Sequence, residues 1–450
     1  MRRTLALAAV ALVSLAAAAT AALLRPVLRP EPPPRQGVRA GALQMTTQLD
    51  RRYLPEGGGG EAVLQIDLAA DPDPSARRRL PVNAVLILDR SGSMTGAKLD
   101  RARDAARALV QALSAQDRLA IVEFGSDASL LFPSSPLTEE ARARALAAID
   151  ALQAMGGTNL SAAFDLAAPE LLRGHAGGRV DKVFLASDGQ ANEGLSDRDG
   201  LLRLAARDFA GATLSTFGMG EDYDEDLMTA FAAQNGGRAR YIASPEVLPG
   251  AFRDELGRAA AAVARNVRLH LEGATVERVL GYEAASGWVR LPDFAAGEQR
   301  RVLVKLRVPP GRGLAELARV QLTFDDAVSG AATAASAGVQ GAYTSDAALL
   351  GLAPTGAAVE GAKAEMAELA QHAAQLQEAG RRDEAAAQLA LLRGVASQTA
   401  RLAPASAAPM LEAARAYEQG VSAIDAPGGA ASKALKQKTF DAVRAPLKGW

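Results

Sequence analysis

Residues 82–94 have the sequence VNAVLILDRSGSM, and this stretch decides the fold. From Val82 to Leu88 the chain is apolar apart from Asn83, which is typical of a strand that is buried on both faces of a sheet. Asp89 ends this strand and begins a polar loop. In an open parallel sheet, the loops that follow the carboxyl ends of the strands form the ligand-binding edge. We therefore expect a parallel α/β sheet with a polar site at its edge.

Alternating strands and helices continue this pattern over residues 82–256. Strands are predicted at 82–88, 119–124, 183–186, 212–217 and 240–243, where short apolar runs occur. Helices are predicted at 99–113, 139–152, 160–172 and 224–233, with a last helix that starts at Pro245. This alternation predicts an α/β fold, a doubly wound and mostly parallel sheet with helices on both faces.

The segments on either side of this domain have a different hydrophobic periodicity. Apolar and polar residues alternate at 43–49 and again at 302–308. Such alternation is typical of antiparallel strands with one face in solvent. Because segments 41–80 and 264–330 share this alternation, we expect them to form one β-sandwich into which residues 82–256 are inserted.

Three further segments complete the predicted organisation. Residues 25–40 are rich in proline, which predicts a semi-rigid linker. Residues 331–360 are rich in Ala and Gly, and we expect a second linker there. Residues 361–450 show helical periodicity and predict a helical tail, a hairpin or short bundle, in which Asp383 caps the second helix.

The composition narrows the classes of function. The chain has 450 residues, of which 49% are hydrophobic and 22% charged, so it is long enough for roughly three domains with sizeable cores. The formal net charge of -1 makes nucleic acid a poor partner. The sequence contains no cysteine, which excludes disulfides, zinc–thiolate sites and lipoprotein anchoring.

The N-terminal residues 1–24 predict export. Arg2 and Arg3 precede an uncharged run that is rich in Leu, Val and Ala, and Arg25 closes it. A helix of this length, about 30 Å, is sufficient to cross a bilayer. The basic start favours a chain whose remainder lies outside the cytoplasm. Either an uncleaved membrane anchor or a cleaved signal peptide fits this pattern.

Oxygen-bearing side chains gather on loops that are expected at one edge of the α/β sheet. Asp89, Ser91 and Ser93 occupy alternate positions around Gly92, a residue expected to let the turn curl. Thr158 precedes the helix predicted at 160–172, and Asp188 follows the strand predicted at 183–186. Hydroxyl and carboxylate oxygens are hard ligands that suit Mg²⁺, Mn²⁺ or Ca²⁺ and not zinc. The alternative is structural: Asp89 caps its loop and the hydroxyls satisfy backbone amides.

These residues resemble a known motif. The Asp-x-Ser-x-Ser sequence from Asp89, the threonine of Gly156-Gly157-Thr158-Asn159 and the aspartate of Ser187-Asp188-Gly189 look like the metal-ion-dependent adhesion site of von Willebrand factor A domains. One departure is Ser187, where the family often has threonine. The layout of the whole chain is also similar to bacterial von Willebrand A proteins related to inter-α-trypsin inhibitor heavy chains.

The resemblance implies a protein-binding module and not an enzyme. It implies that a divalent cation, held by the five residues, captures an Asp or Glu side chain of a partner protein at the cell envelope, in the periplasm or outside the cell. The four glycines Gly57–Gly60 lack the Gly-Lys-Ser/Thr of a phosphate loop, so no nucleotide is expected. Two alternatives remain open, a scaffold stabilised by the metal and an assembly factor or chelatase-type partner of an ATPase.

Overall fold

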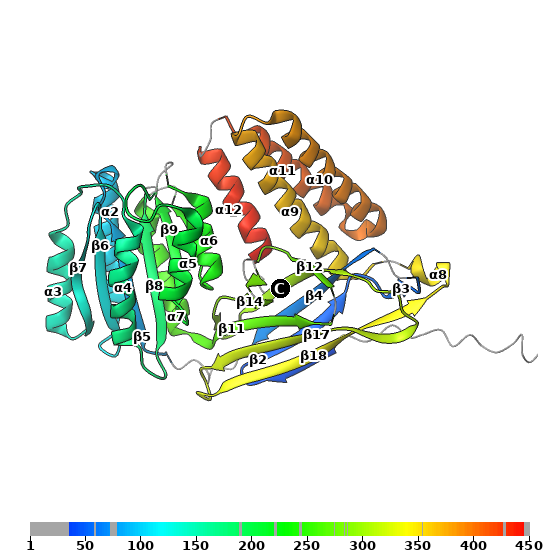
Figure 1. The fold of residues 1–450 in the computed structure, drawn as a ribbon, viewed down its shortest axis with the longest axis horizontal. Coiled ribbons are helices and arrows are strands. Elements are labelled where there is room, and N and C mark those ends of the chain that lie inside the picture. The colour runs from blue at the N-terminus through cyan, green and yellow to red at the C-terminus, as the bar shows by residue number, and fades with distance from the viewer. Residues whose placement is uncertain are drawn as a thin grey trace, which may run out of the picture.

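The computed structural model describes most of the chain beyond the N-terminus. The described residues are 36–57, 60–72, 79–188, 191–219, 223–242, 245–273, 275–282, 284–285, 287–352, 354–425 and 429–444. Within these ranges the chain forms an α/β domain, a β-sandwich beside it and a group of helices that lies against both (Figure 1). The predicted anchor or signal at 1–24 lies outside the described residues. Among the described helices, none combines the length and the apolar character needed to cross a bilayer.

The α/β domain has the doubly wound architecture that the sequence predicts. Its described strands are β5 (Val82–Asp89), β6 (Arg118–Phe124), β7 (Ala128–Pro136), β8 (Val180–Ser187), β9 (Thr213–Met219) and β10 (Ala239–Ile242). They form one sheet in the order β10-β9-β8-β5-β6-β7, in which every neighbouring pair is parallel except β6 and β7. Its described helices are α2 (Ala97–Ala112), α3 (Glu139–Asp150), α4 (Leu160–Gly174), α5 (Arg198–Asp208), α6 (Glu225–Gln234) and α7 (Leu248–Ala260).

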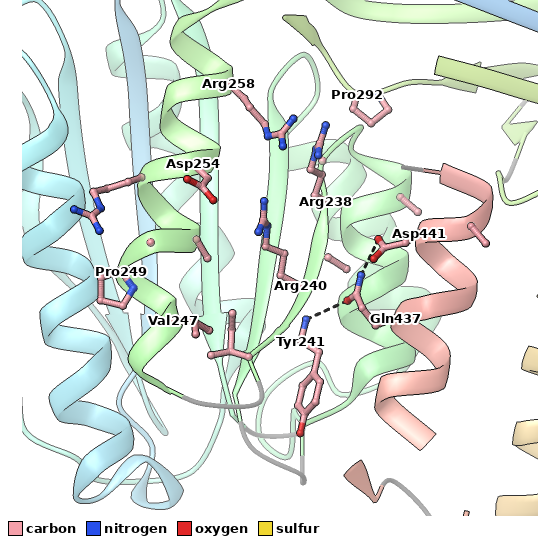
Figure 2. A pocket seen from close by; sticks show the side chains of 18 of the residues that line it. Arg238, Arg240, Tyr241, Val247, Pro249, Asp254, Arg258, Pro292, Gln437 and Asp441 are labelled. Carbon is pink, nitrogen blue, oxygen red and sulfur yellow. Dashed lines mark hydrogen bonds between the residues drawn. The ribbon is translucent and has the colours of Figure 1, made fainter. Parts of the chain in front are cut away.

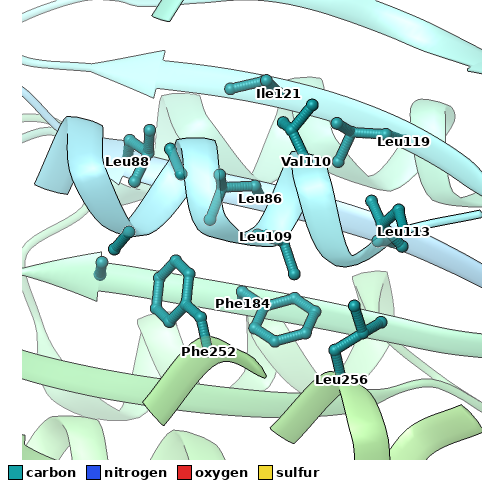
Figure 3. Packing of buried hydrophobic residues seen from close by; sticks show 14 of the residues in the cluster. Leu86, Leu88, Leu109, Val110, Leu113, Leu119, Ile121, Phe184, Phe252 and Leu256 are labelled. Carbon is teal, nitrogen blue, oxygen red and sulfur yellow. The ribbon is translucent and has the colours of Figure 1, made fainter. Parts of the chain in front are cut away.

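Alternate side chains of the central strand β5 pack on opposite faces of this sheet. Leu86 and Leu88 belong to the cluster that includes Leu109 of α2 and Phe252 of α7 (Figure 3). The intervening residues of β5 belong to a second cluster, which α4, α5 and α6 cover. Each leucine or phenylalanine that is fully buried in this way stabilises the fold by about 1.5–3 kcal/mol. The helices on both faces explain why β5 is almost entirely apolar.

The edge strand β7 was not predicted from the sequence. It runs antiparallel to β6 and carries Pro133 and Pro136. Proline cannot donate a hydrogen bond to a ladder, so it disfavours a strand except at an edge. β7 is such an edge, and only the tertiary arrangement shows this.

The β-sandwich is built from both flanks of the α/β domain, as predicted. One sheet has the order β1-β2-β4-β16-β12, in which β4 (Glu61–Ala70) pairs antiparallel with β16 (Gln299–Arg307). The other three strands of this sheet are β1 (Gln36–Ala40), β2 (Leu43–Leu49) and β12 (Thr275–Val279). The chain leaves the sandwich after β4 and returns to it at β11 (Ala262–Glu272), so the α/β domain is an insertion.

The second sheet of the sandwich has the order β13-β14-β11-β17-β18-β3, and β15 also pairs with β11. Its other described strands are β13 (Ala284–Ala285), β14 (Trp288–Arg290), β15 (Phe294–Ala295), β17 (Gly313–Asp326), β18 (Ala332–Thr344) and β3 (Tyr53–Pro55). Met45 and Leu64 of the first sheet share a core with Val267 and Val320 of the second.

The prediction of a linker at 331–360 was wrong. Most of the segment's first half is the strand β18, which pairs with β17 from Gly313 to Asp325. Alanine and glycine have low strand propensity, but the long partner β17 supplies the hydrogen bonds, and tertiary pairing outweighs propensity. The linker predicted at 25–40 is also too long, because β1 occupies 36–40 and the remainder lies outside the described residues.

The C-terminal helices form a bundle that contacts both other parts. They are α9 (Gly356–Glu378), α10 (Arg382–Leu402), α11 (Ala407–Ser422) and α12 (Ala430–Arg444), whereas the short helix α8 (Ala347–Leu350) lies beside β3 of the sandwich. Asp383 does not cap α10 as predicted, because the cap is Arg381 and Asp383 lies in the first turn. Figure 1 shows α12 between the bundle and the α/β domain and α9 against the sandwich.

A buried ion pair ties the last helix of the α/β domain to its sheet. Lys182 on β8 donates to Glu255 on α7 over 2.7 Å, and Ser215 donates to the same carboxylate over 2.9 Å. Burial raises the pKa of Glu255, but the charges of Lys182 and Arg238 outweigh it and lower the pKa from 4.5 to about 2. Because the folded pKa is depressed, the pair's contribution to stability is present above pH 4.5 and is lost as the pH falls toward 2.

We expect Lys182→Met to reduce the free energy of unfolding by about 3–5 kcal/mol, because it removes the cation that is paired with the buried carboxylate of Glu255. Chemical denaturation followed by circular dichroism measures this loss. The double variant Lys182→Met/Glu255→Leu should regain most of the stability. A single variant as stable as the parent protein would contradict the assignment.

Candidate metal centre

Asp89 is held rigidly at the end of the central strand. Its side chain is completely buried, and one carboxylate oxygen accepts a hydrogen bond from the backbone N–H of Ser91 over 2.8 Å. The other oxygen accepts from the hydroxyl of Ser187, which ends the neighbouring strand β8. The serine that departs from the family pattern thus supplies the hydroxyl that a threonine would supply. Asp89 therefore has one fixed orientation at the sheet edge.

The electrostatic environment of Asp89 favours a nearby positive charge. Burial raises the pKa of Asp89 above its ordinary value, and hydrogen bonds from Ser187 and Ser91 oppose this shift. The charge of Asp188 adds to the increase. Two buried carboxylates that repel each other are stabilised when a cation lies beside them.

The two serines of the predicted site connect Asp89 to Asp188. Ser91 and Ser93 flank Gly92, and their hydroxyl oxygens lie 3.0 Å apart. The hydroxyl of Ser93 donates to Asp188 over 2.8 Å. Four of the five predicted residues therefore lie in one continuous hydrogen-bonded network, although they come from two loops.

Thr158 lies on the third loop, which is joined to the first by backbone hydrogen bonds. The N–H of Gly92 donates to the carbonyl of Gly156 over 2.9 Å, and the N–H of Met155 donates to the carbonyl of Arg90 over 2.7 Å. Thr158 is buried, with an exposed fraction of 3%. Among the hydrogen bonds of the described residues, none joins its hydroxyl to the other four side chains. The structure thus brings the loop of Thr158 to the site and leaves its hydroxyl outside the network.

Gly92 does not have the left-handed backbone conformation that favours glycine. Gly92 is part of a short 3-10 turn, Gly92–Met94. The left-handed backbone positions are Gly96, with φ of 79°, and Gly156, with φ of 82°. A Cβ atom at Gly156 would also lie 2.8 Å from the backbone nitrogen of Ser126. Gly156 is therefore the position where a side chain is excluded on both grounds.

Lys98 is a member of the site that sequence reasoning missed. Its ammonium donates to the second oxygen of Asp188 over 2.5 Å, and the Asp188 side chain is completely buried. Lys98 lies in the first turn of α2, directly after the Asp-Ser-Ser loop. A lysine is unfavourable at a helix N-terminus, where the dipole favours acidic residues, and that mismatch was the available signal.

The donor set fits a hard divalent cation better than zinc. The site offers the carboxylates of Asp89 and Asp188, the hydroxyls of Ser91 and Ser93 and, from the third loop, Thr158. No group of three or more His, Cys, Asp or Glu residues that could hold a metal occurs among the described residues. Oxygen donors of this kind suit Mg²⁺, Mn²⁺ and Ca²⁺.

Comparison with known proteins shows the family of this chain. A family model for the von Willebrand factor type A domain matches residues 84–190, which include the Asp89 and Asp188 loops. The chain is 31% identical over 288 residues to an uncharacterized protein, sll0103, of Synechocystis sp., a match that covers 59% of this chain and 67% of that protein. The chain belongs to the von Willebrand factor A domain family. Domains of this family are generally protein-interaction or adhesion modules.

Two further likenesses concern the layout. The chain is 29% identical over 177 residues to human inter-alpha-trypsin inhibitor heavy chain H4, covering 38% of this chain and 19% of that protein. A von Willebrand factor type A protein from Catenulispora acidiphila superposes with a TM-score of 0.69 over 92% of this chain and 100% of that chain, at 19% identity. At that identity the likeness shows the fold alone. Both the predicted family and the predicted fold class are confirmed.

We expect Lys98→Met to reduce the free energy of unfolding by about 1–3 kcal/mol in the absence of added metal, because the buried carboxylate of Asp188 loses its charged partner. Denaturant titration in the presence of a chelator measures the change. Lys98→Arg keeps the positive charge and should retain most of the stability. Equal stability of Lys98→Met and the parent protein would show that the ion pair contributes nothing.

Proposed function

We propose that this protein is a metal-dependent protein-binding module. In this proposal Asp89, Ser91, Ser93, Thr158 and Asp188 hold Mg²⁺, or Mn²⁺ or Ca²⁺, and the ion binds an Asp or Glu side chain of a partner protein. The observation that carries the proposal is the hydrogen-bonded network from Asp89 through both serines to Asp188 at the ligand-binding edge of the sheet.

The charges around the site explain why a partner would be recruited. Asp89 and Asp188 supply two negative charges, and Lys98 already balances one of them. The serine and threonine hydroxyls are neutral. A bound divalent ion would therefore leave the site with a net positive charge. A carboxylate from outside would neutralise that charge through a directional, charge-assisted contact.

The five residues of the proposed site have different roles. Asp89 and Asp188 attract the ion, and each is oriented by hydroxyl groups. Ser91 and Ser93 offer oxygens close to those carboxylates. Ser93 is exposed, so the site is accessible from solvent. The metal would supply two positive charges on one small ion, which no side chain of this loop can do.

We place this module at the cell envelope, outside the cytoplasmic membrane. The support is the basic and then apolar pattern of residues 1–24, which fits a signal peptide or an anchor. If these residues are not cleaved, the membrane is a further partner through them. Neither nucleic acid nor a nucleotide is part of the proposal.

Two alternatives make different predictions. A metal-stabilised scaffold requires the ion for folding and not for binding. An assembly factor or chelatase-type partner of an ATPase requires a cytoplasmic location, which the N-terminal pattern disfavours. The effect of the ion on stability therefore distinguishes the scaffold, and the location of the protein distinguishes the assembly factor.

Asp89→Ala should abolish uptake of divalent ions, because it removes the buried carboxylate from which the network starts. Isothermal titration calorimetry of the purified protein with MgCl₂, MnCl₂ and CaCl₂ measures the loss. Asp100→Ala is a matched control, because Asp100 is an exposed carboxylate on α2 with 65% side-chain exposure. Absence of ion uptake by the parent protein would overturn the proposal.

Capture of a partner distinguishes a binding module from a scaffold. Affinity capture from envelope extract should succeed with the parent protein and the Asp100→Ala control and fail with chelator or Asp89→Ala. An unchanged melting temperature of Asp89→Ala would support binding. A large fall in melting temperature with capture intact would support the scaffold.

A further inference from the structure

A second site lies where the three parts of the chain meet. A cavity of about 1230 Å³ opens between the α/β domain, the sandwich and α12 (Figure 2). Its walls include β10, α7, Pro292 and Arg300 from the sandwich, and Gln437 of α12. β10 is at the edge of the α/β sheet, and β9 and β8 separate it from β5. The cavity is therefore distinct from the metal centre.

Guanidinium groups converge in this cavity. Arg238, Arg240 and Arg258 are turned toward the same space in Figure 2. Arg300 forms another part of the lining and has an exposed fraction of only 1%. Among the described residues, neither Arg240 nor Arg258 has a carboxylate within ion-pair distance. Two of these arginines thus have a positive charge that no described carboxylate balances directly.

The positive charges of the neighbouring arginines disfavour the charged form of Arg238. Burial lowers the pKa of Arg238, Glu255 opposes the shift, and the charges of Arg300 and Arg258 lower it further. Glu298 accepts hydrogen bonds from both Arg238 and Arg300, so one carboxylate serves two guanidinium groups. The Nε atom of Arg300 is buried and has no hydrogen-bond partner. An anion in the cavity would relieve this crowding.

The carboxylates of the cavity only partly offset this charge. The acidic residues in the lining are Glu246, Asp254 and Asp441. Asp441 accepts from Gln437 over 2.9 Å, and Glu246 lies 3.7 Å from Arg101 of α2. With Arg253, the lining has five arginines against these three acids. Glu298, which pairs with Arg238 and Arg300 from outside the lining, reduces the formal surplus to one positive charge.

Much of the remaining lining is apolar. Tyr241, Ile242, Val247, Pro249 and Pro292 contribute it. A cavity of this size, with apolar walls and a few converging polar groups, has the character of a small-molecule site. Arginine binds phosphate bidentately, so clustered guanidinium groups favour a phosphate group above a single carboxylate.

We propose that this cavity binds a small organic phosphate, with the phosphate on Arg238, Arg240 and Arg258 and the organic portion on the apolar wall. The ligand would touch the α/β domain, the sandwich and α12 at once. The N–H of Tyr241 already donates to Gln437 of α12 over 3.2 Å. Binding would therefore stabilise the contact between α12 and the edge strand.

The test is calorimetric titration and thermal melting of the full chain with phenyl phosphate as the probe. Phenol and citrate at matched ionic strength are the comparison ligands. The parent protein should bind phenyl phosphate saturably and melt at a higher temperature with it. Arg240→Gln/Arg258→Gln should weaken binding by about tenfold or more, because each lost charge-assisted contact contributes on this scale.

Matched variants keep this test specific. Arg203→Gln removes an exposed arginine of α5 outside the cavity and should leave binding unchanged. Asp89→Ala should also bind the probe normally, so failure of the metal proposal leaves this one intact. Unchanged binding by the double arginine variant, or no saturable binding by the parent protein, would overturn the site. Tighter binding of citrate than of phenyl phosphate would overturn the phosphate assignment.

Discussion

The hydrogen bonds that fix Asp89 are the constraint on which the candidate site depends. Asp89 ends the central strand, where burial makes its charge costly, and the Ser91 amide and the Ser187 hydroxyl offset part of that cost. Because Ser187 belongs to β8, the orientation of Asp89 depends on the pairing of two parallel strands. The helices on both faces of the sheet keep that pairing intact. The site is thus a consequence of the packed core beneath it.

The negative charge of Asp188 is balanced by donors from the protein. Both of its oxygens have protein donors, one from Ser93 and one from Lys98. The lysine makes a buried carboxylate tolerable without any other cation. The lysine also neutralises part of the negative charge of the site. A bound divalent ion would therefore keep a net positive charge that a partner's carboxylate could neutralise. In this view the lysine links the stability of the domain to its capacity to bind an acidic partner.

The three parts of the chain are joined by charged contacts and by close packing. On the sandwich, Arg301 pairs with Glu360 over 2.8 Å and Lys305 pairs with Glu365 over 2.9 Å, both on α9. A Cβ atom at Gly361 would lie 3.0 Å from the Val63 side chain, so α9 lies very close to β4. On the other side, Lys436 of α12 pairs with Glu225 of α6. The arginine-lined cavity lies between these contacts because the sandwich, α12 and the edge strand β10 meet there.

Local patterns in the sequence determined the α/β domain, the alternating strands of the sandwich and four members of the site network. Apolar periodicity is a local property, and Asp89, Ser91, Ser93 and Asp188 follow strands whose carboxyl ends must share one edge. The tertiary structure alone decided that β18 and β7 are strands, since each depends on a partner that outweighs its own propensity. It also decided the pairing of Lys98 with Asp188 and the convergence of Arg238, Arg240 and Arg258. Lys98 and Asp188 are distant in the chain, and the three arginines lie in or next to the strand β10 and in the helix α7, whose relative placement is set by packing.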